Sequence, residues 1–213
     1  EHIIEVGPGK GALTFPLVKK VTHITAIEID PLLVEYLNNK KTSKLTIKNQ
    51  DILNWEPGFK GKRRVVGNLP YYIASPIIFK LIENKNISDI IIMIQKELAQ
   101  RIASGPNSKD YSRMSVVAQA FCDVTYECDI SRNIFNPKPK VDSAIIKLTK
   151  KDTSLNFKSF SDFIKKAFIH RRKKLKNNLK DYMDNDGINL IGDKRPEGIS
   201  VLEYINIFNK ISF

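Results

Sequence analysis

The sequence is poor in cysteine and histidine, and it has no long apolar run. Cys122 and Cys128 match neither a CxxC pair nor a zinc-site spacing, so we expect two reduced residues in the core. The three histidines have no metal-ligand spacing, which predicts that the protein binds no metal. A membrane span needs roughly 18 apolar residues, whereas the longest run, residues 90–94, is typical of a buried strand. These absences disfavour disulfide-stapled, zinc-dependent and membrane-spanning proteins.

Acidic residues are also few relative to basic ones. The chain of 213 residues has 35 Lys and Arg against 23 Asp and Glu, a net charge of +12. Such an excess predicts a polyanionic partner, with nucleic acid first among the candidates. The alternative is that the lysines only keep the surface solvated. The length suits one mid-sized domain, or a core domain with a small appendage.

Short apolar runs alternate with longer amphipathic ones over residues 1–150. Strands are expected at His2–Val6, His23–Ile29, Leu45–Asn49, Arg64–Val66, Asp89–Ile94, Val124–Ile130 and Val141–Leu148. Helices are expected at Ala12–Lys20, Pro31–Asn39 and Pro76–Asn84. Strands that alternate with helices form a parallel sheet, whereas the last two strands, with little helix between them, predict an antiparallel addition at one edge. The pattern therefore predicts an α/β, Rossmann-like fold of the kind found in S-adenosylmethionine methyltransferases.

Residues 151–213 have a different pattern, which predicts a small helical domain. Ser159-x-x-Asp162 resembles a capping box, and apolar residues then recur at helical spacing from Phe160 to Leu179. A break is expected at 185–187 and a last helix at Ser200–Asn209. We therefore divide the chain into a cofactor-binding domain, residues 1–150, and a helical RNA-binding domain, residues 151–213.

A glycine-rich loop follows the first predicted strand. Gly7 and Gly9 permit a tight turn in which backbone N–H groups approach a ligand. Glu28 and Ile29 end the second strand, where a carboxylate can accept both hydroxyls of an adenosine ribose. The same spacing also satisfies the dinucleotide fingerprint, so a nicotinamide oxidoreductase stays open at this point.

Asp51 and Ile52 come directly after the third predicted strand. A carboxylate at that place can accept a hydrogen bond from the amino group of an adenine ring, which suits any adenosine cofactor. The alternative for Asp51 is an ordinary helix cap.

The tetrapeptide Asn68-Leu69-Pro70-Tyr71 follows the fourth predicted strand, at the sheet edge where ligands of open α/β sheets bind. The exocyclic amine of adenine is planar and a poor nucleophile. The Asn68 side-chain oxygen and the backbone carbonyl of Leu69 or Pro70 could each accept one of its N–H groups and direct its lone pair at a methyl donor. Tyr71 offers a face for stacking the base. The alternative is a polar turn.

A run of basic residues lies in the helical part of the chain, at Arg171, Arg172, Lys173 and Lys174. Guanidinium groups bind phosphate in a bidentate way, so Arg171 and Arg172 are the first candidates for contacts with an RNA backbone. The alternative is a solvated face of one continuous amphipathic helix.

These motifs occur in an order that resembles one family, the KsgA-type ribosomal RNA adenine N6,N6-dimethyltransferases, over nearly the whole chain. The matching stretches are Glu5–Gly11, Asn68–Ile73, Gln95–Glu97, Gly105–Tyr111, Phe135–Ser143 and Arg171–Leu179. The resemblance implies S-adenosylmethionine as cofactor, with Gly7, Glu28, Asp51 and Asn68 in contact with it. It implies that Asn68–Tyr71 hold the target adenine and that Phe135 is a second aromatic near the base.

The resemblance also implies the partner, which is small-subunit ribosomal RNA in an immature subunit, dimethylated at two adjacent adenosines near its 3′ end. We expect a cytoplasmic monomer with no membrane association, although an organellar location stays open. The family has a segment upstream of the first strand that helps to close the cofactor pocket. This chain begins on that strand without methionine, so we expect a shortened protein.

Three alternatives remain open. The related Erm-type enzymes methylate large-subunit RNA, but Leu69, residues 140–143 and residues 171–179 favour the small-subunit type. A ribosome-assembly factor or an organellar transcription factor could use the same fold without catalysis. A nicotinamide oxidoreductase would bind NAD instead of S-adenosylmethionine.

Overall fold

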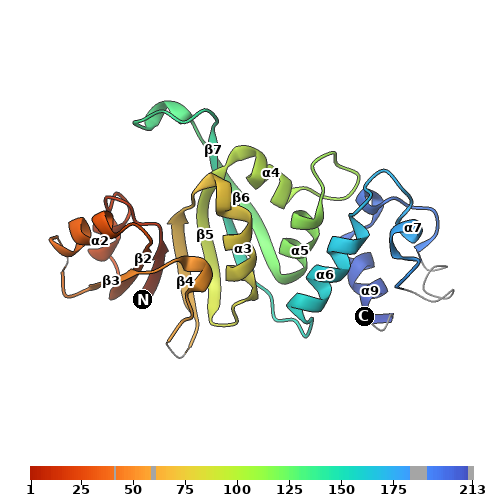
Figure 1. Ribbon diagram of the computed structural model, residues 1–213, viewed down its shortest axis with the longest axis horizontal. Coiled ribbons are helices and arrows are strands. Elements are labelled where there is room, and N and C mark those ends of the chain that lie inside the picture. Colours follow the sequence, from red (N-terminus) through yellow and green to blue (C-terminus); the bar gives the residue numbers. More distant parts are fainter. Residues whose placement is uncertain (41, 59–60, 183–190, 211–213) are drawn as a thin grey trace. The chain divides into compact units, whose positions relative to one another are not determined.

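Residues 1–150 contribute a seven-stranded mixed sheet (Figure 1). The computed structural model describes residues 1–40, 42–58, 61–182 and 191–210. The strand order is β3-β2-β1-β4-β5-β7-β6. The strands are β1 (His2–Val6), β2 (His23–Glu28), β3 (Leu45–Asn49), β4 (Arg63–Asn68), β5 (Ile87–Gln95), β6 (Cys122–Ile130) and β7 (Ser143–Lys150). Neighbouring strands from β3 to β5 are parallel, and β7 pairs antiparallel with β5. The expected sheet with an antiparallel edge is therefore confirmed.

The central strands are almost continuously apolar because helices cover the sheet. Helix α1 (Thr14–Val18) packs on β2, α2 (Pro31–Asn38) on β2 and β3, and α3 (Ala74–Glu83) on β5. Helix α2 begins where predicted because the Asp30 carboxylate accepts from Leu32 N at 2.8 Å and Pro31 occupies the first turn. Helix α1 is shorter than the predicted 12–20.

Glycine lets strands β1 and β4 lie unusually close together. Val6 of β1 is paired in register with Gly67 of β4. A Cβ atom on Gly67 would lie 2.6 Å from the Val6 carbonyl oxygen, so no other residue fits without a shift of backbone. The close approach brings the loop that follows β1 beside the loop that follows β4, since a Cβ on Gly7 would lie 3.6 Å from Asn68 O.

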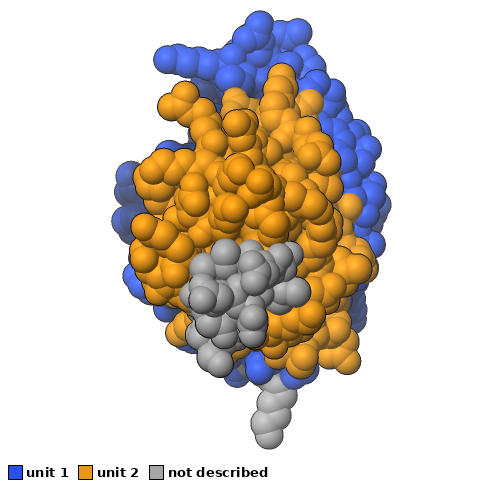
Figure 2. All heavy atoms as spheres, turned by 90° about the vertical axis from the view of Figure 1, so that its right-hand side faces the viewer, with its two compact units in different colours: residues 1–96, 125–150 blue, residues 97–124, 151–213 orange. Residues whose placement is uncertain are grey.

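The chain forms two compact units (Figure 2). The first consists of residues 1–96 and 125–150, and the second consists of residues 97–124 and 151–213. Its elements are α4 (Lys96–Ala103), α5 (Arg113–Phe121), α6 (Phe157–Ala167), α7 (Leu175–Leu179), the 3-10 turn η4 (Pro196–Gly198) and α9 (Val201–Lys210). Helices α4 and α5 were not predicted. Phe121 of α5 packs its ring against Phe157 and Phe160 of α6. The division by function into residues 1–150 and 151–213 stays a prediction.

The prediction of one continuous helix across the basic run is wrong. Helix α6 ends at Ala167, turns occupy 168–173, and α7 begins at Leu175. The Asn178 amide nitrogen donates to Ala167 O at 2.7 Å and to His170 O at 3.2 Å, which satisfies carbonyls freed by the end of α6. The N-cap of α6 is Asn156 rather than Ser159.

Two smaller expectations have different outcomes. Cys122 is buried as expected, but Cys128 is exposed on β6, so the prediction of two core cysteines is wrong for the second. The break expected at 185–187 lies outside the described residues.

Candidate active site at the carboxyl edge of the sheet

The glycine-rich loop after β1 takes a conformation that requires glycine. Gly7 has φ of 66° and Gly9 has φ of 57°, both in the left-handed region. Gly7 N donates to Ile27 O at 3.0 Å, so the loop is fixed to the end of β2. A Cβ on Gly9 would meet no atom within 4 Å, and the loop therefore leaves open space in front of its backbone.

The Glu28 carboxylate is fixed at the end of β2. One oxygen accepts from Gly9 N at 3.1 Å, and the other accepts from Ile29 N and Asp30 N at 2.9 and 3.1 Å. Glu28 is only 6% exposed, whereas Ile29 beside it is 63% exposed. A preoriented acceptor next to an accessible apolar side chain suits a ribose and its attached ring, and the cofactor contact of both residues stays a prediction.

Asp51 follows the end of β3, which is joined to the end of β2 because Gln50 N donates to the Glu28 backbone carbonyl at 2.9 Å. Asp51 caps the 3-10 turn η1 (Ile52–Asn54), and one of its carboxylate oxygens accepts from Leu53 N at 2.9 Å. The capping interpretation therefore holds, and the second oxygen has no hydrogen bond within the described residues. Ile52 is buried, which places its side chain in the core. The adenine contact of Asp51 and Ile52 stays a prediction.

Glu5 is a further candidate site residue, which the sequence did not reveal by itself. It is 2% exposed at the end of β1, and its Oε2 atom has no hydrogen-bond partner in the described part of the chain. Burial raises the pKa of Glu5 to about 7, the Thr14 hydroxyl lowers it and the Glu28 carboxylate raises it further. An acidic residue inside an apolar strand just before glycines was the available signal. A buried carboxyl oxygen without a partner, two residues before the glycine loop, is a candidate acceptor for a cationic group of a cofactor.

We predict that Glu5→Gln changes the pH dependence of stability. The pKa of Glu5 is higher in the folded state than in the unfolded state. The contribution of this group to the free energy of unfolding is therefore fully present at acid pH and is lost as pH rises from about 4.5 through 7. As pH rises through this range, the free energy of unfolding of the variant should increase relative to that of the parent. The difference should reach up to about 3 kcal/mol above pH 7. Urea unfolding across pH measures it. The exposed Glu35→Gln is the control, and parallel curves for Glu5→Gln would contradict the prediction.

The Asn68–Tyr71 segment begins at the last residue of β4 and offers one exposed acceptor, the Asn68 side-chain oxygen. Asn68 is exposed, and its side chain makes no hydrogen bond to any described residue. Leu69 is buried, and its N–H donates to Met93 O at 3.1 Å, which fixes the segment to β5. Pro70 O already accepts from Ile73 N at 3.2 Å, so Leu69 O is the better candidate for the second acceptor.

An aromatic hollow of about 290 Å³ brings two distant segments together. Its lining residues are Asn68, Leu69, Pro70, Tyr71, Phe135, Pro137 and Pro139. Tyr71 lies in the 3-10 turn η2 (Tyr71–Ile73), and its hydroxyl is 2.7 Å from Ser143 Oγ. Phe135 comes from the β6–β7 loop, residues 131–142, which extends away from the sheet (Figure 1). The structure therefore places Phe135 beside the tetrapeptide, as the resemblance implied.

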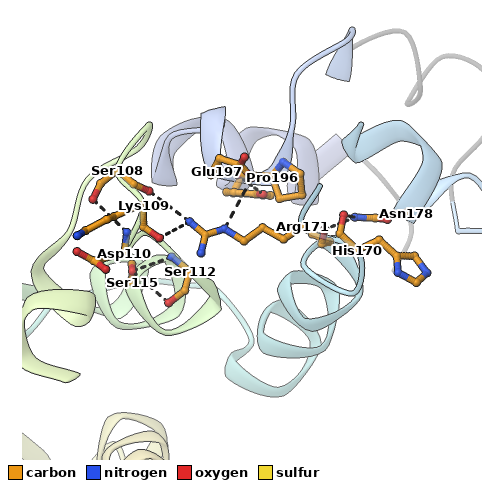
Figure 3. Close-up of polar contacts among 12 residues, drawn as sticks. Ser108, Lys109, Asp110, Ser112, Ser115, His170, Arg171, Asn178, Pro196 and Glu197 are labelled. Carbon is orange, nitrogen blue, oxygen red and sulfur yellow. Dashed lines mark hydrogen bonds and ion pairs between the residues drawn. The ribbon is translucent and has the colours of Figure 1, made fainter. Parts of the chain in front are cut away.

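The four basic residues of the predicted RNA contact fall into two pairs. Arg171 donates from Nη2 to Ser108 O and Lys109 O at 3.4 and 2.5 Å, and its Nε lies 3.9 Å from Glu197 Oε2 (Figure 3). Lys174 Nζ is 2.8 Å from Asp193 Oδ2. Arg172 and Lys173 are exposed, and their side chains make no hydrogen bond or ion pair to a described residue. Arg171 therefore holds a loop of its own unit together, while Arg172 and Lys173 remain accessible.

Metal-ligand groups and membrane-spanning helices were sought only among the described residues. No group of three or more His, Cys, Asp or Glu side chains is arranged to hold a metal ion there. No helix among these residues combines the length and apolarity that crossing a membrane requires.

Comparison with known proteins gives concordant matches. The family described as ribosomal RNA adenine dimethylase matches residues 1–212. A relative from Mycoplasmopsis pulmonis, named ribosomal RNA small subunit methyltransferase A, is 48% identical over 88% of this chain and 76% of its own length. The dimethyladenosine transferase crystal structure from Plasmodium falciparum has a TM-score of 0.83 at 26% identity, covering 98% of this chain and 90% of that one. The 23S rRNA methyltransferase ErmE has a TM-score of 0.75 at 24% identity, covering 99% and 90%.

Proposed function

The chain belongs to the ribosomal RNA adenine dimethylase family, and from that premise we propose how its residues carry out the reaction and on which RNA. The protein is an S-adenosylmethionine-dependent methyltransferase that dimethylates adenine at N6 in ribosomal RNA. The proposed targets are two adjacent adenosines near the 3′ end of small-subunit RNA, methylated in the immature subunit during ribosome biogenesis. The aromatic hollow beside the glycine loop carries this proposal.

The residues around the glycine loop fit the cofactor. S-adenosylmethionine, when bound, supplies an electrophilic methyl group. The backbone of Gly7 and Gly9 would lie against it, and the fixed Glu28 carboxylate would accept from its ribose hydroxyls. Asp51 and Ile52 would lie at the adenine ring. The unpartnered Oε2 of Glu5 would accept from a cationic group.

Asn68 and Leu69 prepare the target amine. The Asn68 side-chain oxygen and Leu69 O each accept one N–H of N6, which draws both hydrogens to one side and leaves the lone pair free to attack. Pro70 fixes the backbone of the segment. Tyr71 and Phe135 hold the base by stacking, at about 1–3 kcal/mol for each stacked base. No strong base is needed because N6 becomes acidic only as the methyl is transferred, and alignment supplies most of the rate.

Binding of the RNA backbone is proposed for the run 171–174, chiefly through Arg172 and Lys173 because Arg171 and Lys174 already have partners. We predict that Arg172→Ala and Lys173→Ala each lower RNA affinity and reduce the slope of log K against log salt by about 0.7–0.9. Lys174→Ala is the matched control, and its slope should change much less. Salt titrations of binding measure all three variants. Equal changes at the three positions would contradict the assignment.

One incubation tests the function. Immature small subunits are mixed with the protein and heavy-methyl S-adenosylmethionine, and the RNA is analysed by mass spectrometry. Two dimethylated adenosines near the 3′ end are expected. Methylation of naked large-subunit RNA alone would indicate the Erm-type activity, and subunit binding without methyl transfer would indicate an assembly or transcription factor. Calorimetry that compares binding of S-adenosylmethionine with binding of NAD tests the oxidoreductase alternative, which requires that NAD be bound.

The setting of the enzyme is proposed on the same basis. We place it in the cytoplasm, as a monomer without membrane association, with an organellar location as the alternative. The similarity to ErmE, at 24% identity, concerns the fold alone, whereas relatives that are 38% and 48% identical are named for the small subunit.

A further inference from the structure

We propose that Asp142 and Ser143 are positioning residues that set the two walls of the aromatic hollow relative to each other. One wall is the Asn68–Tyr71 segment and the other is the β6–β7 loop. Neither Asp142 nor Ser143 lines the hollow, yet each is bonded to one of its walls. The inference rests on the proposed function, because it concerns how the target base is held.

Ser143 fixes the ring of Tyr71. It is the first residue of β7, is fully buried, and is paired in register with Gln95 of β5. Its hydroxyl lies 2.7 Å from the Tyr71 hydroxyl, and either oxygen can donate. Tyr71 is only half-buried, so the hydrogen bond restricts a ring that would otherwise change its tilt. A hydroxyl anchored in the sheet therefore determines where this stacking surface lies.

Asp142 closes the base of the β6–β7 loop. Its Oδ1 atom accepts from Arg132 N at 3.0 Å, and Arg132 Nη1 donates to Lys140 O at 2.8 Å. The Asp142 carbonyl accepts from Lys96 N at 3.0 Å, which joins the base of the loop to the end of β5. Phe135 lies within the closed segment. The backbone that carries Phe135 is therefore closed at its base by the contacts of Arg132 and Asp142.

Because Asp142 and Ser143 are adjacent, one peptide bond connects the anchors of both walls. A displacement at Asp142 is transmitted to Ser143 and from there to Tyr71. Methyl transfer depends steeply on alignment, and a misplacement of about 1 Å can lower the rate on the order of a hundredfold. The dipeptide can therefore change catalysis without contact to base or cofactor.

Paired variants test this arrangement through kcat, KM and cofactor affinity. Ser143→Ala and Tyr71→Phe remove the same hydrogen bond from opposite sides. Each should lower kcat on the order of tenfold, the double variant should fall no further, and cofactor affinity should stay within about twofold. Thr149→Val is the matched control, because the Thr149 hydroxyl bonds Asp89 elsewhere on β7. Losses that multiply in the double variant would overturn the role of Ser143.

A second pair of measurements addresses Asp142: hydrogen exchange, which needs no RNA, and kcat. Asp142→Ala should speed hydrogen exchange in the β6–β7 loop by at least tenfold and lower kcat, and Asp142→Asn, which keeps an acceptor, should recover most of both. Unchanged exchange and kcat in Asp142→Ala would overturn the proposal. If the parent protein did not methylate small-subunit RNA, the proposed function would fail instead, and the exchange result would still decide whether Asp142 closes the loop. Thermal unfolding of every variant separates these effects from loss of fold.

Discussion

Replacing Asn68 with alanine should lower kcat for methyl transfer by on the order of a thousandfold, because one of two acceptors for the target amine is removed. In the parent, the exposed Asn68 oxygen and Leu69 O can each hold one N–H of N6. With one acceptor the nitrogen stays planar, and its lone pair remains in the ring. The loss should be in kcat, since Tyr71 and Phe135 still stack the base and the basic run still binds RNA.

Single-turnover transfer of a labelled methyl to small subunits measures this effect, with RNA affinity determined in parallel. Asn38→Ala replaces an exposed asparagine on α2 and serves as the control, with activity equal to the parent. Asn68→Asp keeps an acceptor and should retain more activity than Asn68→Ala. Transfer by Asn68→Ala within about tenfold of the parent would show that the amine is held in another way.

Replacing Gly67 with alanine should destabilise the protein by about 2–3 kcal/mol, because the new methyl would lie within 2.6 Å of the Val6 carbonyl oxygen. Strands β1 and β4 would have to separate at the register pair Val6–Gly67. The shift would also move the glycine loop away from Asn68, so cofactor affinity should fall along with stability. A flexible side chain could rotate out of such a contact, whereas a backbone carbonyl in a central strand cannot.

Urea unfolding and cofactor titration measure the two consequences of the Gly67→Ala change. Gly58→Ala is the matched control in the same unit, since a Cβ at that position meets no atom within 4 Å. It should leave both stability and cofactor affinity close to the parent. Wild-type stability in Gly67→Ala would mean that β1 and β4 can separate at little cost.

The sheet could be predicted from the sequence because each strand has a local signal. Every observed strand overlaps an expected one, although the fourth was expected at residues 64–66 and extends over Arg63–Asn68. Helix α5 could not be predicted in this way. Nearly all its residues from Met114 to Phe121 are buried, so the sequence there lacks the alternation between apolar and polar faces that marks a surface helix.

Contacts between distant segments explain the remaining differences. The spacing from Phe160 to Leu179 fits one helix because α6 and α7 both bury apolar residues, and only the Asn178 amide bonds show where α6 ends. Arg171 looks like a phosphate ligand in the sequence, but its partners are backbone carbonyls about 60 residues away, which no local pattern encodes. The proximity of Phe135 to Tyr71 could be stated only from the resemblance.

The second unit is formed from two separate stretches of the chain, and this has a consequence for protein synthesis. Helix α5 leaves the ribosome early, yet Phe121 packs against α6, and α5 also contacts α9 close to the carboxyl terminus. Translation of the intervening chain takes on the order of ten seconds at roughly 5–20 residues per second. During that interval Phe121 lacks its partner rings from α6 and is open to chaperones. The helical unit of residues 97–124 and 151–213 can therefore be completed only after α9 has been made.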